Sequence, residues 1–252
     1  MRAADPGARL TPDQQRAADA GVKAMMPVNG RPFLDYVLSS VADAGITDAA
    51  LVVAPDHEEI RRYYARDVRP ARLRIGFVVQ EQPLGTAHAL LCAEAWAGGE
   101  PFLAINGDNL YPAAALRSLV DLEEPGLAAF DRDDLIRSGN IPADRIRAFA
   151  IIEVDARGYL ARIVEKPPQD THQQSRLISM NCWRFDRRIF SACRAVPQSE
   201  RGEFELPQAV GLALSRGVAF RAVEARGAVL DLSRRADAAV LADLLAPVAP
   251  RL

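Results

Sequence analysis

The stretch PFLAINGDNLYPAAALRSLVDLEE, residues 101–124, places an apolar strand, a polar tip and a helix in direct succession. The apolar run ends at Asn106-Gly107-Asp108, and residues 113–124 have apolar side chains at helical spacing. Open α/β sheets bind ligands beyond the carboxyl ends of their strands, which is where this tip lies. The stretch therefore predicts an α/β fold that carries the carboxylate of Asp108 at its ligand-binding edge.

The same alternation continues on both sides of this stretch. In the first half we expect helices at 33–45, 57–66 and 86–97, and strands at 50–55 and 74–80. In the second half we expect strands at 148–155, 159–167, 178–186, 219–225 and 228–232, and helices near 207–216 and at 236–246. This pattern predicts a three-layer α/β/α sandwich with a mostly parallel mixed sheet and a small antiparallel subsheet. No internal repeat or linker interrupts it, so we expect a single domain over 1–252.

The composition is that of an ordinary globular chain. A net charge of −2 argues against a nucleic-acid stripe and against an anionic-membrane surface. No apolar run approaches the ~20 residues of a membrane span, and no signal sequence is visible, so we expect a cytoplasmic protein. Cys92, Cys182 and Cys193 lack metal-like spacing and are interpreted as free thiols in a reducing compartment.

Polar residues follow two of the expected strands. Asp108 beside a glycine suits a divalent cation bound to phosphate oxygens, although it could instead cap the following helix. Gln80 can donate to and accept from the edge of a nucleobase. Gly85 and Thr86 open a helix whose free N–H groups favour an anionic or acceptor-rich ligand. His88 lies at helical spacing from apolar neighbours, so we interpret it as a structural residue.

Charged residues mark three further places. Only two of the 31 basic residues are lysines, and one of them, Lys23, precedes an apolar stretch as a flexible cation entering a pocket. Glu165 and Lys166 end a strand before two prolines, which suits sugar hydroxyls and a phosphate, or else forms a solvated surface ion pair. Asp231 lies mid-strand, where a buried carboxylate needs a metal or several donors. Ser233 is expected to cap the last helix.

Taken in order, these segments resemble the nucleoside-diphosphate-sugar pyrophosphorylases, which are sugar-1-phosphate nucleotidyltransferases with a glycosyltransferase-A-like Rossmann fold. The matching segments are VKAMMPVNGRPFLDYVL (22–38), QEQPLGTAHAL (80–90), NGDNLY (106–111), IVEKP (163–167), MNCWRFD (180–186), RGEFELPQAV (201–210) and VLDL (229–232). The resemblance implies a Rossmann-like nucleotidyltransferase domain with a nucleotide-binding half at 22–130 and a sugar-binding half at 131–252.

The resemblance also implies an activity. A sugar-1-phosphate oxygen would attack the α-phosphorus of an NTP in line and release pyrophosphate, which needs positioning and charge neutralisation more than a covalent nucleophile. UTP or dTTP is favoured, because QEQPLGTAHA resembles the loops of uridylyl- and thymidylyltransferases. The acceptor is left open between glucose-1-phosphate, N-acetylglucosamine-1-phosphate and another phosphorylated small alcohol. A homo-oligomer is left open as well.

By resemblance the site residues would divide into four groups. These are Mg²⁺ ligands, Asp108 and Asp231; nucleobase contacts, Gln80, Gly85 and Thr86; sugar-hydroxyl contacts, Glu165 and Asn181; and catalytic residues, Asp108 with Lys23 at the nucleotide phosphates and Lys166 at the sugar phosphate.

Two departures from the family pattern stand out. Asn181-Cys182-Trp183 replaces Asn-x-Gly, so we expect Trp183 to add bulk beside the sugar or to reshape its wall. The family begins with a strand and the loop L-A-A-G-x-G-x-R, whose N–H groups cradle phosphates. MRAADPGARL does not fit that loop, because Asp5 would repel the triphosphate. We therefore expect residues 1–21 to be a connector with a helical insertion from Thr11, and the strands flanking the absent first strand to be left unpaired.

Two alternatives stay open. One is a catalytically impaired homologue that binds nucleotide or sugar phosphate as a regulatory subunit. The other is a glycosyltransferase of the same broad fold, which would use Asp-x-Asp where this chain has Asn106-Gly107-Asp108.

Overall fold

The computed structural model describes residues 10–20, 22–165 and 175–252. Its largest sheet has the strand order β11-β7-β10-β8-β9, and β5 also pairs with β10. The bounds of these strands are β5 Phe102–Ala104, β7 Gly126–Asp131, β8 Ala150–Val154, β9 Leu160–Val164, β10 Leu177–Phe185 and β11 Arg221–Ala225. In this sheet β11 runs parallel to β7, and β10 runs antiparallel to β5, β7 and β8. The sheet is therefore mixed, as expected, but the expectation that it is mostly parallel is wrong: among its described strands β11–β7 is the parallel pairing, whereas β10 with β5, β7 and β8, and β8 with β9, are antiparallel.

Three smaller pairs of strands complete the β structure. The parallel pair is β3 (Asp48–Val53) with β4 (Arg74–Val79). The antiparallel pairs are β1 (Pro27–Val28) with β2 (Arg31–Pro32), and β6 (Asn109–Leu110) with β12 (Leu230–Asp231). The last of these matters most for the site, because it joins the polar tip after β5 to the C-terminal part of the chain.

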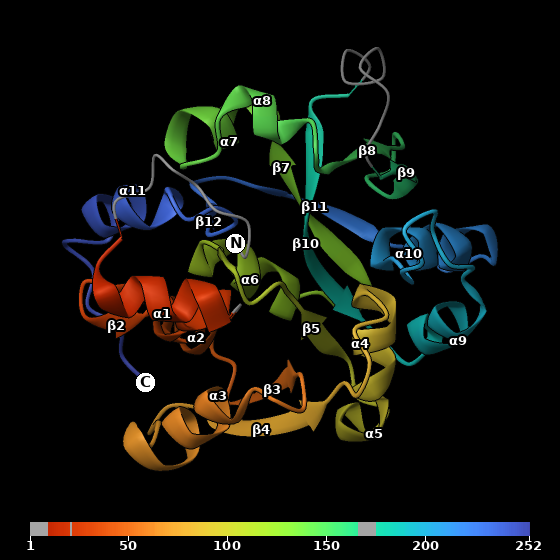
Figure 1. The fold of residues 1–252 in the computed structure, drawn as a ribbon. Coiled ribbons are helices and arrows are strands. Elements are labelled where there is room, and N and C mark those ends of the chain that lie inside the picture. The colour runs from red at the N-terminus through yellow and green to blue at the C-terminus, as the bar shows by residue number, and fades with distance from the viewer. Residues whose placement is uncertain (1–9, 21, 166–174) are drawn as a thin grey trace.

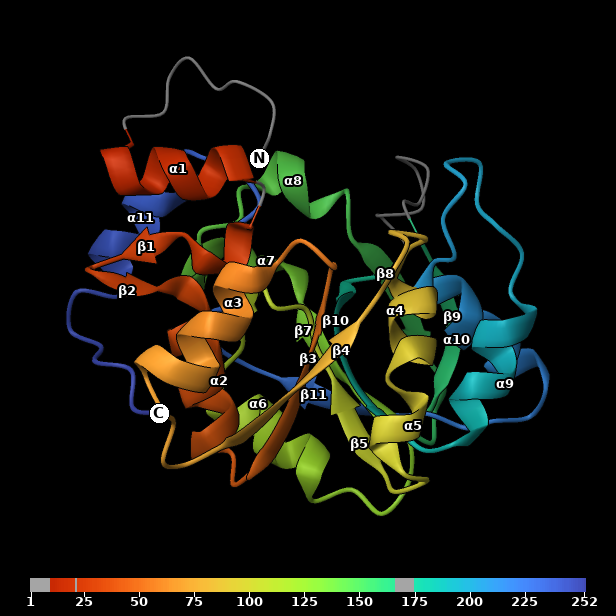
Figure 2. The ribbon, with the colours of Figure 1, turned by 60° about the horizontal axis from the view of Figure 1, so that its bottom comes forward.

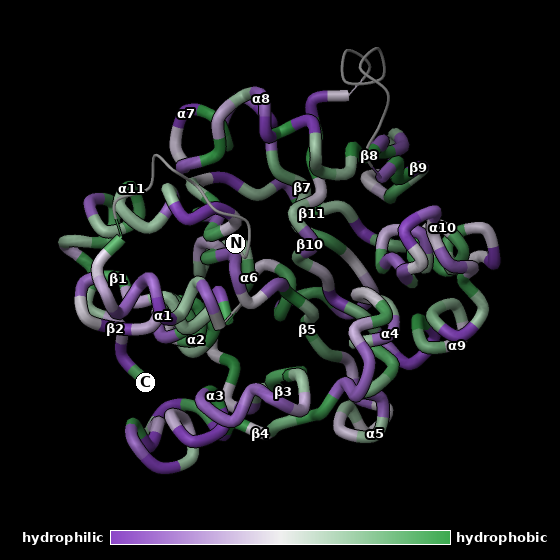
Figure 3. Tube along the Cα trace, in the orientation of Figure 1, coloured by the Kyte–Doolittle hydropathy of each residue, from purple (hydrophilic) through white to green (hydrophobic). Residues whose placement is uncertain are grey.

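Helices cover both faces of the large sheet, which gives the three layers (Figure 1). One hydrophobic core packs under α2 (Phe33–Asp43) and α6 (Ala113–Val120), and the other under α4 (Thr86–Cys92), α9 (Arg188–Ala195) and α10 (Leu206–Ser215). Strand β7 shows the division directly, because successive side chains of a strand point to opposite faces. Ala128 and Phe130 join the first core, and Leu127 and Ala129 join the second. Hydrophobic residues accordingly line β5 and β7 in Figure 3.

The remaining helices lie around this frame. They are α1 Pro12–Ala20, α3 Glu58–Arg62, α5 Glu94–Ala97, α7 Arg132–Ser138, α8 Ala143–Ile146 and α11 Asp237–Leu244, with a 3₁₀ turn at Lys23–Met25 and a π-helical turn at Tyr63–Asp67. No helix in the described part of the chain is long and apolar enough to cross a membrane.

Helix α1 has the cap expected from the sequence. The hydroxyl of Thr11 accepts a hydrogen bond from the backbone N–H of Gln14, and the side chain of Gln14 accepts one from the N–H of Thr11. This reciprocal pair satisfies two donors at the helix start. The Gln14 amide also donates to the carbonyl of Pro27, which ties α1 to β1, beside α11 (Figure 2). The helical insertion is therefore present at the expected place; the part of the connector before Leu10 lies outside the described residues.

Strands β3 and β5 each have one strand partner within the described residues. β3 pairs with β4, and β5 pairs with β10, so each leaves one edge without a ladder.

Several expected elements differ in extent. The expected helix at 113–124 ends at Val120, because residues 121–125 turn into β7, a buried strand that the sequence reading did not include. The expected helix at 57–66 changes to a π turn at Tyr63, where Tyr63 and Tyr64 both reach the buried Asp35. Helices α7 and α9 were also not expected.

Candidate functional site

The 3₁₀ turn and the β5–β6 turn bring Lys23 and Asp108 together. The Lys23 Nζ atom lies 3.7 Å from Asp108 Oδ2, and the two side chains are 36% and 30% exposed. A cation and a carboxylate at this distance and exposure can both reach a polyanionic ligand and the metal ion that accompanies it. The backbone of Asp108 is fixed by a 2.9 Å hydrogen bond that its carbonyl accepts from the N–H of Leu232.

Asp231 lies next to this pair but is buried, with 2% of its surface exposed. Its Oδ1 accepts hydrogen bonds from the Asn109 amide and from the Ser233 hydroxyl, each at 2.9 Å. Its Oδ2 accepts from the guanidinium of Arg145. The expectation that Ser233 caps the last helix is wrong, because the residue before α11 is Ala236 and the Ser233 hydroxyl donates its hydrogen bond to Asp231.

Arg145 on α8 bridges two carboxylates. One of its amino groups bonds Asp231, and Nη1 lies 2.6 Å from Asp237 Oδ1. All three residues are nearly buried, so the guanidinium is taken from water together with both acids. A buried charge of this kind is tolerated only when it is paired and hydrogen-bonded, as it is here.

Of the two aspartates expected to bind Mg²⁺, one, Asp108, has a carboxylate that is available as a ligand. Asp108 has an accessible carboxylate, and Mg²⁺ is commonly held by one or two carboxylates together with substrate phosphates. Both oxygens of Asp231 already have donors. Within the described residues there is no group of three or more His, Cys, Asp or Glu side chains suited to a metal ion.

The expected nucleobase residues meet around the start of α4. The Gln80 amide nitrogen donates to the carbonyl of Gly85 at 3.1 Å and lies 3.0 Å from His88 Nδ1. If both amide hydrogens are used in this way, Nδ1 of His88 is the unprotonated nitrogen, and the side-chain oxygen of Gln80 is the acceptor that this amide can offer to a ligand. His88 therefore supports the loop through a hydrogen bond, in agreement with its structural interpretation.

Gly85 allows the loop to pass close to the segment before α10. Its φ is +102°, and a Cβ built on it would lie 2.6 Å from the carbonyl oxygen of Phe204. The approach is used for pairing, because the carbonyl of Phe204 accepts from Ala87 N and its N–H donates to the carbonyl of Leu84, both at 2.8 Å. The Thr86 hydroxyl accepts from the N–H of Leu206 at 2.9 Å, so this side chain also serves the α10 start.

Asn181 lies at an irregularity in β10. Its φ is +55°, and the register with β7 shifts between Ser179 and Trp183. The indole of Trp183 is fully buried, stacks on Phe185 with ring centroids 5.6 Å apart and belongs to the second core. It therefore adds no bulk at the surface of the site, and the alternative, a reshaped wall, stays a prediction. Its Nε1 donates to the side-chain oxygen Oδ1 of Asn181 at 3.3 Å. Trp183 thus holds the side chain of Asn181 through a hydrogen bond from the second core.

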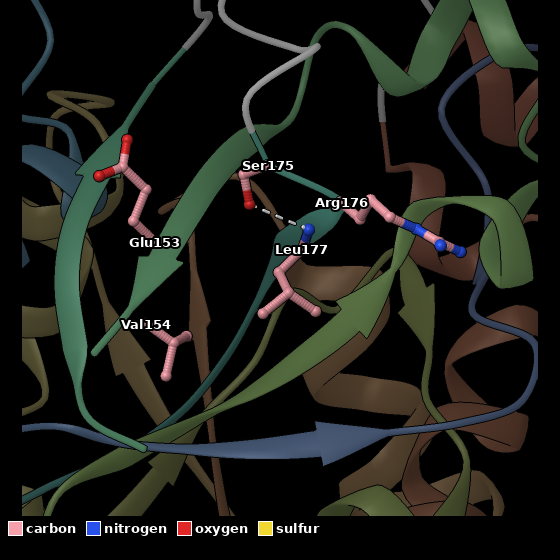
Figure 4. Close-up of a pocket in the computed structure, with 5 residues that line it drawn as sticks. All are labelled: Glu153, Val154, Ser175, Arg176 and Leu177. Atoms are coloured by element: carbon pink, nitrogen blue, oxygen red, sulfur yellow. Dashed lines mark hydrogen bonds between the residues drawn. The ribbon is translucent and has the colours of Figure 1, made fainter. Parts of the chain in front are cut away.

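The third expected segment is described only in part. Glu165 directly follows β9. The pKa of Arg201 is raised mainly by its hydrogen bond to Glu205 and to a smaller extent by the charge of Glu165, so Glu165 lies near this guanidinium. Lys166 lies outside the described residues. A hollow of about 630 Å³ lies at the start of β10. It is lined by Glu153, Val154, Ser175, Arg176 and Leu177, whose side chains are drawn in Figure 4. It contains none of the expected site residues.

The three thiols are free, as expected. Burial raises the pKa of Cys182, and burial raises the pKa of Cys193 to about 12. Cys92 is half-buried, and burial raises its pKa as well. None of the three is therefore poised as a thiolate at neutral pH.

Sequence reasoning missed the residues that hold Asp231. Asn109 directly follows Asp108, so its place in a polar tip was a usable signal. Arg145 and Asn140 lie in the irregular stretch between β7 and β8, and no spacing links them to Asp231, 86 and 91 residues later. Only the tertiary fold brings them together.

Comparison with known proteins identifies the family of the chain. Residues 7–232 match the family model described as nucleotidyl transferase. The chain belongs to the nucleotidyl transferase family. It is 30% identical over 242 residues to a glucose-1-phosphate thymidylyltransferase of Streptomyces antibioticus, covering 92% of this chain and 61% of that protein. It is 28% identical over 230 residues to the UTP–glucose-1-phosphate uridylyltransferase AglF of Haloferax volcanii, covering 91% and 88%.

The nucleotidyl transferase fold is also found among solved structures. UDP-glucose pyrophosphorylase complexed with UDP-glucose superposes with a TM-score of 0.73 at 19% identity, covering 89% of this chain and 90% of that one. At this identity the likeness concerns the fold. The chain spans 61% and 56% of the lengths of two relatives, the S. antibioticus enzyme and the low-salt glycan biosynthesis nucleotidyltransferase Agl11 of H. volcanii.

Proposed function

We propose that the chain transfers a nucleoside monophosphate from an NTP to a sugar-1-phosphate, giving an NDP-sugar and pyrophosphate. The observation that carries the proposal is the accessible Lys23–Asp108 pair at 3.7 Å, placed at the carboxyl end of β5 in a nucleotidyl transferase fold. Phosphoryl-type transfer depends on positioning and on neutralising phosphate charge, and this pair provides a cation and a metal-binding carboxylate.

In this proposal a sugar-phosphate oxygen forms a bond to the α-phosphorus while the bond from that phosphorus to the pyrophosphate oxygen breaks. Lys23 contacts the nucleotide phosphates and stabilises the charge on the leaving pyrophosphate. Asp108 holds Mg²⁺, which when bound neutralises the phosphate oxygens. Lys166 holds the sugar phosphate, and Glu165 and Asn181 accept from and donate to sugar hydroxyls.

We favour UTP or dTTP as the nucleotide. Gln80 offers a carbonyl oxygen beside the loop, and uracil and thymine carry an N–H donor on the edge that would meet it. Gly85 lets the loop pack against the backbone of Phe204, and Thr86 secures the loop through Leu206. The relatives named as thymidylyl- and uridylyltransferases support the same choice, and their names make glucose-1-phosphate the first acceptor to test.

The test is a pyrophosphate-release assay over UTP, dTTP and purine NTPs, each with glucose-1-phosphate and N-acetylglucosamine-1-phosphate, alongside calorimetry of nucleotide binding. The proposal expects release that needs a sugar phosphate and is abolished in Asp108→Asn. Nucleotide binding without release for any pair would contradict it and favour a regulatory binding protein.

A further inference from the structure

Asp231 is already paired with a cation, the guanidinium of Arg145. Its Oδ2 accepts from the Arg145 guanidinium, its Oδ1 accepts from Asn109 and Ser233, and all of these donors belong to the chain itself. A cation that bound Asp231 would have to displace Arg145 or lie against its positive charge in a site from which water is nearly excluded. Like charges at such short range in a low dielectric repel strongly.

The backbone of Asp231 is held as firmly as its carboxylate. The Asn140 side chain donates to the carbonyl of Asp231 at 2.7 Å and accepts from its N–H at 2.8 Å. Asp237 completes the frame: its Oδ1 bonds Arg145, and its Oδ2 accepts from the N–H groups of Ser233 and Arg234 at 3.0 and 2.6 Å. Asp231 is therefore clamped from several segments.

The clamp reaches Asp108 through the backbone. Asp231 pairs with Asn109 across β12 and β6, and the next residue, Leu232, donates to the carbonyl of Asp108. Whatever holds Asp231 in β12 therefore holds the turn that presents the Asp108 carboxylate beside Lys23.

We propose that Arg145 takes the place of a cation at Asp231, so that Asp231 is a positioning residue bound to Arg145, and Asp108 is the one carboxylate of this pair that contacts a metal–nucleotide complex. This replaces the two-carboxylate metal site expected from the sequence. The metal half of the inference rests on the proposed function, whereas the Arg145–Asp231 pairing does not.

The metal half is tested with Mn²⁺ as the probe, by electron paramagnetic resonance of the free ion in the presence of UTP or dTTP. Asp108→Asn should weaken Mn²⁺ binding by about tenfold or more, as loss of a ligand does. Asp231→Asn should weaken Mn²⁺ binding clearly less than Asp108→Asn does, because it removes no ligand and acts only through the turn that presents Asp108. Asp243→Asn, an exposed acid on α11, is the control for the change in net charge.

Arg145→Gln gives a readout that a purely structural role would not move. Removing the guanidinium frees an oxygen of Asp231 and removes the repulsion, so this variant should bind Mn²⁺ more tightly than the parent. Equal weakening by Asp231→Asn and Asp108→Asn, or Mn²⁺ binding by a folded Arg145→Gln that is no tighter than the parent's, would overturn the metal half.

The pairing half is tested by thermal unfolding in EDTA, with the two single variants and the double variant Arg145→Gln/Asp231→Asn. Each single change should lower Tm by roughly 5 °C or more, because it leaves buried charge without its partner. The double variant should lose clearly less than the sum of the two. A strictly additive loss would refute the pairing, even if the protein proved to bind no metal–nucleotide and the proposed function failed.

Discussion

The hydroxyl of Thr86 accepts a hydrogen bond from the backbone N–H of Leu206 at 2.9 Å, across 120 residues of sequence. Leu206 is the first residue of α10, so its N–H is one of those that no carbonyl inside the helix can satisfy. The loop that carries the proposed nucleobase contacts thus caps a helix of the opposite half of the chain.

Removing that cap should cost stability without removing bulk. Thr86→Val keeps the shape of the side chain but leaves the N–H of Leu206 without its acceptor, so we expect a loss of about 1 kcal/mol in the free energy of unfolding. Thr86→Ser retains the hydroxyl and should recover most of it. Urea unfolding of the three proteins decides the matter, and equal stability of the Val and Thr forms would show that the bond contributes nothing.

Gly85 should tolerate no side chain. Gly85→Ala places a Cβ 2.6 Å from the Phe204 carbonyl oxygen at a φ of +102°, and both effects oppose the loop. We expect a loss of about 3 kcal/mol or more, together with weaker nucleotide binding, because the backbone has to shift. Gly99→Ala is the matched control: its φ is +86°, but a Cβ there has nothing within 4 Å. If the two variants were equally stable, the close approach to Phe204 would have no energetic weight.

Lys23 should affect turnover far more than folding. Lys23→Met removes the cation beside Asp108 from a side chain that is 36% exposed, so Tm should change little while kcat/KM falls by about 100-fold. Steady-state pyrophosphate release measures kcat/KM, and thermal melting measures Tm. Arg16→Gln, a 75% exposed cation on α1, should leave both unchanged. Undiminished turnover in Lys23→Met would remove Lys23 from the proposed catalytic residues.

The fully buried carboxylate of Asp35 should depend on two tyrosines. Its oxygens accept from the hydroxyls of Tyr63 and Tyr64, each at 2.9 Å. Tyr64→Phe leaves one oxygen short of a donor and should cost about 1–3 kcal/mol in urea unfolding. Tyr159→Phe, whose hydroxyl bonds the 39% exposed Glu124, should cost less. The reverse order would contradict the burial argument.

The same cluster sets an alkaline limit to stability. Burial and the nearby Asp35 carboxylate raise the pKa of Tyr63 from 10.0 to about 12, and they raise the pKa of Tyr64 as well. As pH rises, the tyrosines of the unfolded state therefore lose their protons before Tyr63 of the folded state does. The contribution of Tyr63 to the free energy of unfolding is complete below pH 10.0 and is lost as pH rises toward about 12. Unfolding free energies measured across this window should fall more steeply in the parent than in Tyr63→Phe, and parallel curves would argue against it.

The sequence predicts the frame of this fold where elements are long and periodic. Helix α2 and strand β4 lie within a few residues of their expected bounds, because their apolar residues follow one period throughout. Strand β7 escaped prediction, since GLAAFD is buried on both faces and follows directly on a helical pattern. Nothing in its period distinguishes it from the end of that helix.

The candidate site divides in the same way. Lys23, Asp108 and Gln80 could be singled out because each stands at the end of a recognisable element or motif. Arg145 could not, because its importance comes from its contacts with Asp231 and Asp237 rather than from its sequence neighbours. Trp183 was expected beside the sugar but joins the second core with Phe185, because β10 is largely buried on both faces and its sequence pattern does not show which core a side chain enters.

The clamp on Asp231 also has a temporal consequence. Its partners Asn109, Asn140 and Arg145 precede it by 122, 91 and 86 residues. Closing loops of that length costs chain entropy that only later contacts repay, so these bonds form slowly relative to helices and hairpins. On the ribosome the turn that presents Asp108 emerges long before β12 exists to brace it. We therefore expect Asp108 to reach its final position beside Lys23 only after the segment that carries β12 has left the ribosome.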